Sequence, residues 1–155
     1  MEGTRMPVRD RPRGAPTGPI GVVTGEELRS VSGLEFLSGI VAGRYPAPPI
    51  SATLGFRLAE VELGRALFIG LPERAFYNPI GTVHGGWAST LLDSCMGCAV
   101  HSTLAAGQGY TTLELKVNLV RAITDTTGEV RAEGRTLATG RRVATAEGRI
   151  IDSAG

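Results

Sequence analysis

The feature that most constrains the fold of this chain is a helical stretch over residues 85–104 that is apolar or small on nearly every side. A helix on a protein surface has one apolar stripe and one polar face. The stretch GGWASTLLDSCMGCAVHSTL instead carries a single certain charge, at Asp93. Such a helix must be surrounded by other elements, and its glycine, alanine and serine residues let a sheet approach its backbone closely. The sequence therefore predicts a central helix that a sheet wraps.

The chain on either side of this helix predicts the sheet. Short apolar runs that are bounded by turn residues, or that alternate with polar residues, are typical of strands. The clearest case is residues 111–121, where apolar and polar side chains alternate with a period of two. Two strands are expected before the helix and three after it, over residues 54–61, 65–71, 111–121, 129–138 and 141–152. Together with the helix, these strands define an α+β protein with an antiparallel sheet.

The chain before the first strand predicts a leader and an extra N-terminal helix. Residues 1–23 hold four arginines, four prolines and four glycines, so we expect a flexible leader. Thr24, followed three residues later by Glu27, is a capping-box pattern that predicts a helix start. Apolar residues then recur on one helical face as far as Val41, after which a glycine and three prolines end the helix. We therefore expect a single domain over residues 24–155.

Composition excludes several classes of protein. A chain of 155 residues has room for one core, and no run reaches the roughly 18 to 20 apolar residues of a membrane span. The net charge of +1 gives no reason to expect nucleic acid or an anionic membrane as a partner. Two cysteines cannot build a disulfide framework, and the N-terminus lacks the apolar segment of a secretory signal. We expect a cytoplasmic protein.

Asp93 is the first candidate for chemistry. An unpaired carboxylate in apolar surroundings costs several kcal/mol unless partners or water are supplied. Asp93 therefore either belongs to a functional site or hydrogen-bonds to backbone or to a partner subunit across a polar gap. The sequence leaves both interpretations open, because perturbed carboxylates cluster at functional sites without being confined to them.

The helix entrance is the second candidate. The first N–H groups of a helix have no acceptor within it and attract anions or polarised oxygens. Gly85 and Gly86 remove the side chains that would keep a substrate from that backbone, although the same pair would also suit a tight turn that His84 caps. Asp93 follows Gly85 by about 12 Å of helical rise, and Asn78 can bring an amide to the same place. N–H donors beside a carboxylate suit acyl transfer from a carbonyl.

The segment NPIGTVHGGWASTLLDSCMGCAV, followed by TTLELKVNLVR and GRRVATAEGRI, resembles the hotdog-fold acyl-CoA thioesterases of the PaaI-like (phenylacetate-degradation) group. The resemblance covers about residues 34–152. It implies a long helix wrapped by an antiparallel sheet, and a dimer whose sheets join edge to edge, often paired into a tetramer. Relatives continue past the position of Asp152 with a further strand, so we expect the last strand of the family to be missing here.

The resemblance also implies roles for individual residues. The backbone N–H of Gly85 matches the group that polarises the thioester carbonyl, with Gly86 beside it against the substrate. Asp93 matches the catalytic carboxylate, as nucleophile or as general base on water. Asn78 matches a residue that helps place the thioester or the water, and His84 one that shapes the helix entrance.

Thr112 falls near a strand hydroxyl that faces the neighbouring subunit's carboxylate in relatives, with Thr111 as the alternative. Each site would then be completed across a subunit interface, and a monomer would be inactive. For the phosphates of coenzyme A, which is part of the substrate rather than a cofactor, guanidinium groups are suitable partners. Our candidates are Arg121, Arg141 and Arg142.

Cys95, Cys98 and His101 occupy neighbouring helical positions, but there is no second cysteine pair and no preceding thioredoxin-like strand. We interpret the cysteines as small buried residues and predict no metal site. The leading hypothesis is an acyl-CoA thioesterase. The alternatives are a hotdog acyl-thioester dehydratase or hydratase, in which His84 would have to transfer the proton, and a non-catalytic acyl-CoA binding module.

Overall fold

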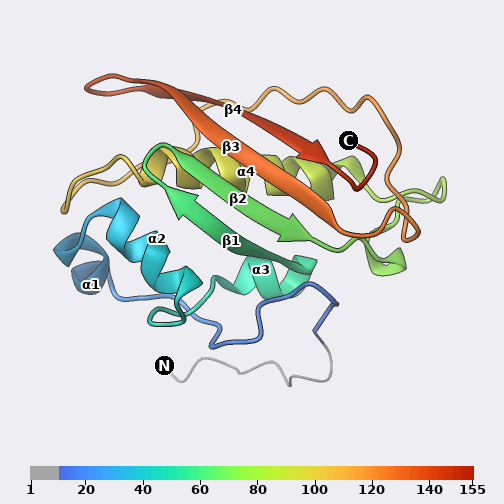
Figure 1. Cartoon of the computed structure of the whole chain (residues 1–155), viewed down its shortest axis with the longest axis horizontal. Helices are drawn as coiled ribbons and strands as arrows, with labels where there is room; N and C mark the ends of the chain where they lie inside the picture. Colours follow the sequence, from blue (N-terminus) through green and yellow to red (C-terminus); the bar gives the residue numbers. More distant parts are fainter. Residues whose placement is uncertain (1–10) are drawn as a thin grey trace.

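The computed structural model describes residues 11–155 and shows one long helix lying against a four-stranded antiparallel sheet (Figure 1). The sheet has the strand order β1-β2-β3-β4, and the long helix is α4. The expected architecture, a central helix packed by an antiparallel sheet, is confirmed. These elements are β1 (Phe56–Glu62), β2 (Arg65–Gly70), α4 (Gly85–His101), β3 (Val130–Thr139) and β4 (Ala144–Ile151). Within residues 11–155 no helix is long and apolar enough to cross a membrane.

The backbone of α4 packs directly against the backbone of the sheet. Trp87, Leu91, Cys95 and Ala99 line the sheet-facing side of α4 and are buried. Opposite them β3 carries Gly134, where a Cβ atom would collide with the carbonyl of Cys95. The small residues of the helix therefore serve close packing, as the sequence indicated.

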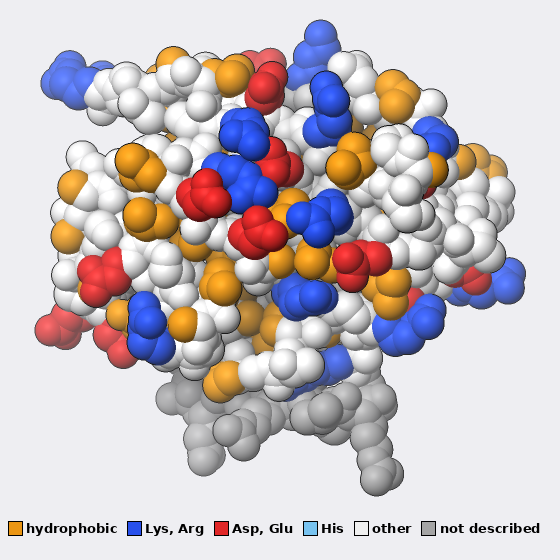
Figure 2. All heavy atoms as spheres, viewed as in Figure 1, with side chains coloured by type: hydrophobic (Ala, Val, Ile, Leu, Met, Phe, Trp, Pro, Cys, Tyr) orange, Lys and Arg blue, Asp and Glu red, His pale blue; other side chains and the backbone are white. Residues whose placement is uncertain are grey.

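The outer face of the sheet is charged instead of apolar (Figure 2). Arg65 on β2 makes ion pairs with Glu60 and Glu62 on β1, at 3.1 and 3.4 Å, and with Glu133 on β3 at 2.8 Å. These pairs neutralise a guanidinium that is only 16% exposed. The sheet thus has one face for α4 and one for solvent.

The N-terminal helix is two helices, so the prediction of one continuous helix is wrong. α1 (Gly25–Ser30) has the capping box of Thr24 and Glu27, whereas α2 (Gly33–Val41) starts at Ser32, whose hydroxyl accepts the N–H of Glu35. Gly33 lies against the carbonyl of His101, leaving no space for a side chain. The break coincides with a contact at the end of α4, and it also has a local signal, because Ser32 and Glu35 have the same spacing as Thr24 and Glu27.

A further short helix, α3 (Pro49–Leu54), lies where the sequence predicted an irregular proline-rich loop and the start of a strand. Pro49 occupies the first turn, where its missing N–H costs nothing, and Gly55 ends the helix in a left-handed conformation with φ 64°. The proline-rich segment thus follows α2 and also starts α3. A short 3₁₀ turn over Arg74–Phe76 precedes the loop that leads into α4.

Residues 111–121 are not a strand in this structure, and that prediction is wrong. In the part of the chain that the structure describes, the segment joins no ladder, and β4 forms the edge of the sheet. Its apolar side chains divide between half-buried Leu115 and Val117 and exposed Leu113 and Leu119. A period of two reports which side chains are buried, but a strand also needs a neighbouring backbone to pair with.

The described part of the expected leader, residues 11–23, contacts the rest of the chain at both ends. The N–H and Nε of Arg13 donate to Glu73 Oε1 at 2.7 and 3.2 Å. Further along, Gly21 N–H donates to the carbonyl of Ala47 at 3.0 Å, and Ile20 forms an isolated parallel bridge with Ala47. Residues 1–10 of the expected leader lie outside the described residues.

Replacing Gly134 with alanine tests the backbone contact between β3 and α4. Alanine is intrinsically better than glycine in a strand, but here its methyl meets the rigid Cys95 carbonyl. We expect Gly134→Ala to lower the free energy of unfolding by about 3 kcal/mol, measured by urea denaturation. Gly148→Ala on β4 is the control, because its methyl would approach the movable Met96 side chain, at 2.9 Å from Cγ, and should cost less. Equal stability of Gly134→Ala and wild type would contradict this packing.

Candidate active site

The entrance of α4 is fixed by hydrogen bonds on both sides of His84. The His84 N–H donates to the carbonyl of Phe76, and Nδ1 of the same residue accepts the N–H of Gly86, both at 2.8 Å. His84 is thus the N-cap of α4. Among residues 11–155, the N–H of Gly85 has no acceptor, as expected for the first residue of a helix. One backbone donor with partial positive charge is therefore left free at the helix start.

The side chain of Asn78 makes its hydrogen bonds within the turn that contains it. Its side-chain N–H donates to Thr82 Oγ1 at 2.9 Å, and its Oδ1 accepts the N–H groups of Ile80 and Thr82 at 3.1 and 3.2 Å. The structure thus gives Asn78 a part in shaping the loop before α4, with its amide turned to that loop. The expected contact between Asn78 and a substrate stays a prediction.

Asp93 lies on the side of α4 that faces away from the sheet and is half-buried. The hydroxyl of Thr112 donates to Asp93 Oδ1 at 2.8 Å. We expected such a contact across a subunit interface, but the structure forms it within one chain. Of the two threonines considered, both of which are exposed, Thr112 makes this contact. The structure therefore brings together the carboxylate and the hydroxyl that the sequence singled out.

Two side chains that the sequence analysis missed lie along the same side of α4. The Tyr110 hydroxyl is 2.9 Å from the position that a Cβ atom of Gly97 would occupy, and Leu119 Cδ1 is 2.5 Å from the corresponding position of Gly85. Together with the bond from Thr112 to Asp93, these contacts hold residues 110–121 against α4. Gly97 was the available signal, because glycine inside a helix costs about 1 kcal/mol relative to alanine.

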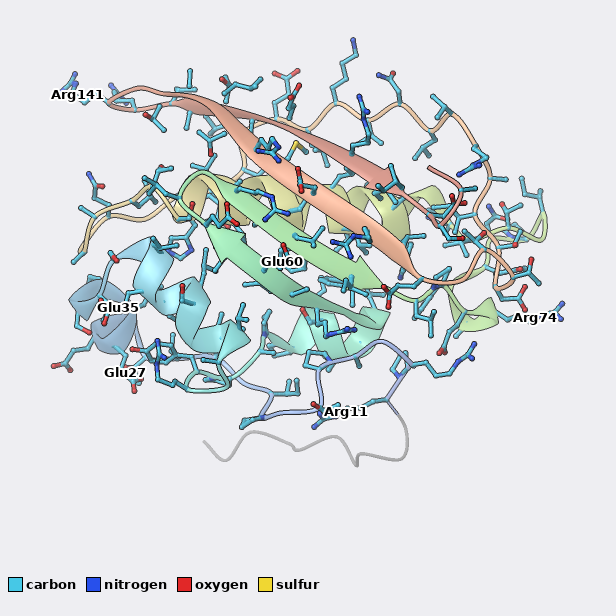
Figure 3. All side chains as sticks on the ribbon, viewed as in Figure 1. Arg11, Glu27, Glu35, Glu60, Arg74 and Arg141 are labelled. Carbon is cyan, nitrogen blue, oxygen red and sulfur yellow. The ribbon has the colours of Figure 1, made fainter. Side chains whose placement is uncertain are left out.

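The candidate phosphate-binding arginines lie apart. Arg121 pairs with Asp152 at 2.8 Å, just beyond the C-terminal end of β4. Arg141 and Arg142 lie in the loop that precedes β4, and Figure 3 shows Arg141 at the tip of the β3–β4 hairpin. The full length of β4 separates these two places, so they cannot hold the same phosphate.

The cysteines of α4 are not reactive groups. Burial raises the pKa of the Cys95 thiol, and that of the Cys98 thiol, to about 12. The nearby His101 ring packs between Phe36 and Tyr110, with centroids 5.7 and 5.3 Å away, and burial lowers its pKa. Within residues 11–155 no group of three or more histidine, cysteine or acidic side chains is placed to hold a metal ion.

Comparisons with known proteins identify the family. The model of the thioesterase superfamily matches residues 80–155, which include the α4 entrance, Asp93 and Thr112. No curated protein sequence matches the chain. The fold is similar to that of a phenylacetic acid degradation-related protein from Ralstonia eutropha JMP134, with a TM-score of 0.70 and 28% identity over 77% of this chain and 91% of that one.

Two further solved structures agree. A conserved protein from Pseudomonas aeruginosa is 31% identical, with a TM-score of 0.63 over 68% of this chain and 82% of that one. A thioesterase family protein from Silicibacter pomeroyi is 26% identical, with a TM-score of 0.66 over 74% of this chain and 82% of that one. The chain belongs to the thioesterase superfamily, and its fold is the hotdog fold.

Proposed function

We propose that this protein is an acyl-CoA thioesterase, which hydrolyses an acyl-CoA to a free carboxylic acid and coenzyme A. The observation that carries the proposal is the position of Asp93. It is the only acid on an otherwise apolar or small helix, and its oxygen accepts a hydrogen bond from Thr112 on the face away from the sheet. The same helix begins with the free N–H of Gly85. A carboxylate and a preorganised N–H donor on one rigid element are the two groups that thioester hydrolysis needs.

The proposed reaction uses each group once. The Gly85 N–H donates to the carbonyl oxygen of the thioester and stabilises the negative charge that develops there. Because about 12 Å of helical rise separates Gly85 from Asp93 in one chain, Asp93 of the partner subunit completes the site. It either attacks the carbonyl carbon or takes a proton from the water that does so.

In the general-base route the carbon–sulfur bond then breaks, and the thiolate of coenzyme A takes up the proton that Asp93 removed from water. In the nucleophilic route the same bond breaks to leave the acyl group on Asp93 as a mixed anhydride, and the thiolate takes up a proton from solvent. A water then hydrolyses the anhydride to the free acid and regenerates the carboxylate.

Thr112 orients the carboxylate in this scheme. Because its hydroxyl donates to Oδ1, the second oxygen of Asp93 is the one free to meet water or substrate. His84 fixes the helix entrance by capping α4, and a Cβ atom at Gly86 would lie 2.9 Å from His84 Nδ1. The Leu119 side chain lies beside Gly85.

A dehydratase or hydratase is supported less well. That chemistry needs a histidine that exchanges protons with the substrate, and His84 Nδ1 is already the acceptor for the Gly86 N–H. A non-catalytic acyl-CoA binding module would bind at the same face of α4 without hydrolysis. The assay below separates this module from the thioesterase.

Self-association through residues 111–121 is part of the proposal. Leu113 is 76% exposed and Val120 93% exposed, and in the described chain β4 leaves one edge of the sheet without a partner strand. Exposed apolar side chains beside an unpaired strand edge are typical of surfaces that join two copies of a chain. We propose that the dimer forms here, so that the interface lies directly beside Asp93.

Replacing Asp93 with asparagine tests the reaction. We expect Asp93→Asn to lower kcat at least 100-fold for acyl-CoA thioesters, because the amide can neither attack nor take a proton. Release of coenzyme A is followed with a thiol-trapping reagent, against a blank that contains protein and reagent without substrate. The matched control is Glu26→Gln, which changes an acid to its amide at an exposed position in α1, away from residues 111–121.

Full activity in Asp93→Asn would contradict the proposed role. Binding of acyl-CoA without release of thiol by the wild type would support the binding module, and hydration of an enoyl-CoA without release would support the hydratase.

The proposed interface is tested with Val120→Asp, which places a charge at the most exposed apolar position of the segment. Sedimentation velocity should show a dimer or tetramer for the wild type and a monomer for the variant. Leu63→Asp is the control, because Leu63 is 71% exposed in the turn between β1 and β2, and it should assemble like the wild type. A monomeric wild type would refute this interface.

A further inference from the structure

A cavity of about 290 Å³ lies between α2, β1 and the N-terminal segment, and the proposed reaction does not use it (Figure 1). The only residue of α4 that lines it is Cys98, so it is separate from the helix entrance and from Asp93. Residues 16–19 form one of its walls. Backbone bonds fix that wall in place, because the Ala47 N–H donates to the carbonyl of Pro19 at 2.9 Å and the Gly21 N–H to that of Ala47 at 3.0 Å.

The cavity passes along the edge of the sheet at β1 and connects two different environments. Leu58 pairs with Phe68 of β2, and both pack against the core around α4. The preceding residue, Arg57, points to the opposite face of the sheet. It pairs with Ile69, which is opposite Arg131 in the outward-facing row. Because Leu58, Phe68 and Arg57 all line the cavity, one of its ends is apolar and the other is cationic.

The charge at the outer end has no counter-charge from the protein. Arg57 is half-buried and forms no ion pair within residues 11–155, whereas Arg65 of the same sheet pairs with three acids. In the described part of the chain no aspartate or glutamate lines the cavity, and the buried Ser51 adds a hydroxyl to its wall. A guanidinium presents parallel N–H donors that match a carboxylate. The outer end is therefore suited to an anion.

The volume of the cavity limits the size of that anion. An apolar cavity of about 150 Å³ accepts benzene. A space of about 290 Å³ thus accepts a tail of one aromatic ring or about eight carbons, but not the nucleotide of coenzyme A. An unfilled apolar space also loses dispersion contacts, which such a tail would restore. The ligand that fits is a small amphipathic acid.

We propose that this cavity binds an apolar monocarboxylic acid, with its tail against Leu58 and Phe68 and its carboxylate at Arg57. This is a second ligand site, in addition to the proposed active site. Acids of this class are what the proposed reaction would release, but the binding itself does not depend on hydrolysis. The bound acid would join α2 and the N-terminal segment to β1.

A pair of ligands with the same tail tests the role of Arg57. Octanoate has a carboxylate, whereas octanol does not. We expect Arg57→Gln to raise the Kd of octanoate at least about 5-fold and that of octanol less than about 2-fold in calorimetry, because only the acid loses a charge-assisted hydrogen bond. Arg44→Gln is the control and should change neither, because Arg44 is exposed and does not line the cavity. Failure of octanoate to bind the wild type, or an equal effect of Arg57→Gln on both ligands, would overturn the inference.

Filling the cavity tests where the tail lies. Ala47 is half-buried and lines the cavity, so Ala47→Phe should occupy the space of the tail. We expect the Kd of both octanoate and octanol to rise at least about 5-fold. The circular dichroism spectrum shows whether the variant is folded, and Arg57→Gln carries the test if it is not. Unchanged Kd values in folded Ala47→Phe would place the ligands elsewhere and refute the site.

A competition experiment separates this site from the proposed active site. The S-ethyl thioether of coenzyme A cannot be hydrolysed, and octanoate should bind with the same Kd when this thioether is present in excess. Displacement of octanoate would show that it binds where the thioester reacts, which would refute a second site. If the protein hydrolyses no acyl-CoA but octanoate binding still depends on Arg57, the cavity site stands and the proposed function fails. Normal hydrolysis without octanoate binding would show the reverse.

Discussion

The backbone contact between α4 and the sheet is the constraint on which the rest of the structure depends. Cys95 presents its carbonyl to Gly134, and a side chain at position 134 would force the layers apart. A helix that packs this closely needs small residues, and the glycine among them, such as Gly97, costs about 1 kcal/mol of helix propensity relative to alanine. The helix therefore depends on the sheet for its stability, and the sheet depends on the helix for its core.

The small residues of α4 also shape the proposed site on the side of the helix that faces away from the sheet. Gly85 and Gly97 leave two notches there, and Asp93 lies between them. Because no bulky side chain of α4 fills this side, residues 110–121 can approach and insert Tyr110, Thr112 and Leu119. The features that let the sheet pack closely on one face thus let residues 110–121 pack against the other face, beside Asp93. Structure and proposed chemistry share one set of residues.

Periodic signals in the sequence were sufficient where the structure depends on local patterns. The all-round apolar stretch gave α4 to within a few residues, and the two hairpins of the sheet followed from their turn residues. The failures differ in kind. The break at Ser32 had a local signal, because Ser32 and Glu35 have the spacing of a helix start, whereas residues 111–121 have the pattern of a strand without a partner in the described chain. The contact from Thr112 to Asp93 formed as a pair of residue types suggested, but Tyr110 could be reached only by asking what fills the space above Gly97.

The central claim is that a thioester binds with its carbonyl oxygen at the start of α4 of one copy and its carbon beside Asp93 of the partner subunit. A crystal structure of Asp93→Asn with an acyl-CoA bound tests it most directly. The account predicts the thioester oxygen within hydrogen-bonding distance of the Gly85 nitrogen and the thioester carbon against residue 93 of the partner subunit. It would be contradicted if the thioester lay elsewhere, for instance in the cavity of about 290 Å³ between α2, β1 and the N-terminal segment, which Leu37 and Leu58 line.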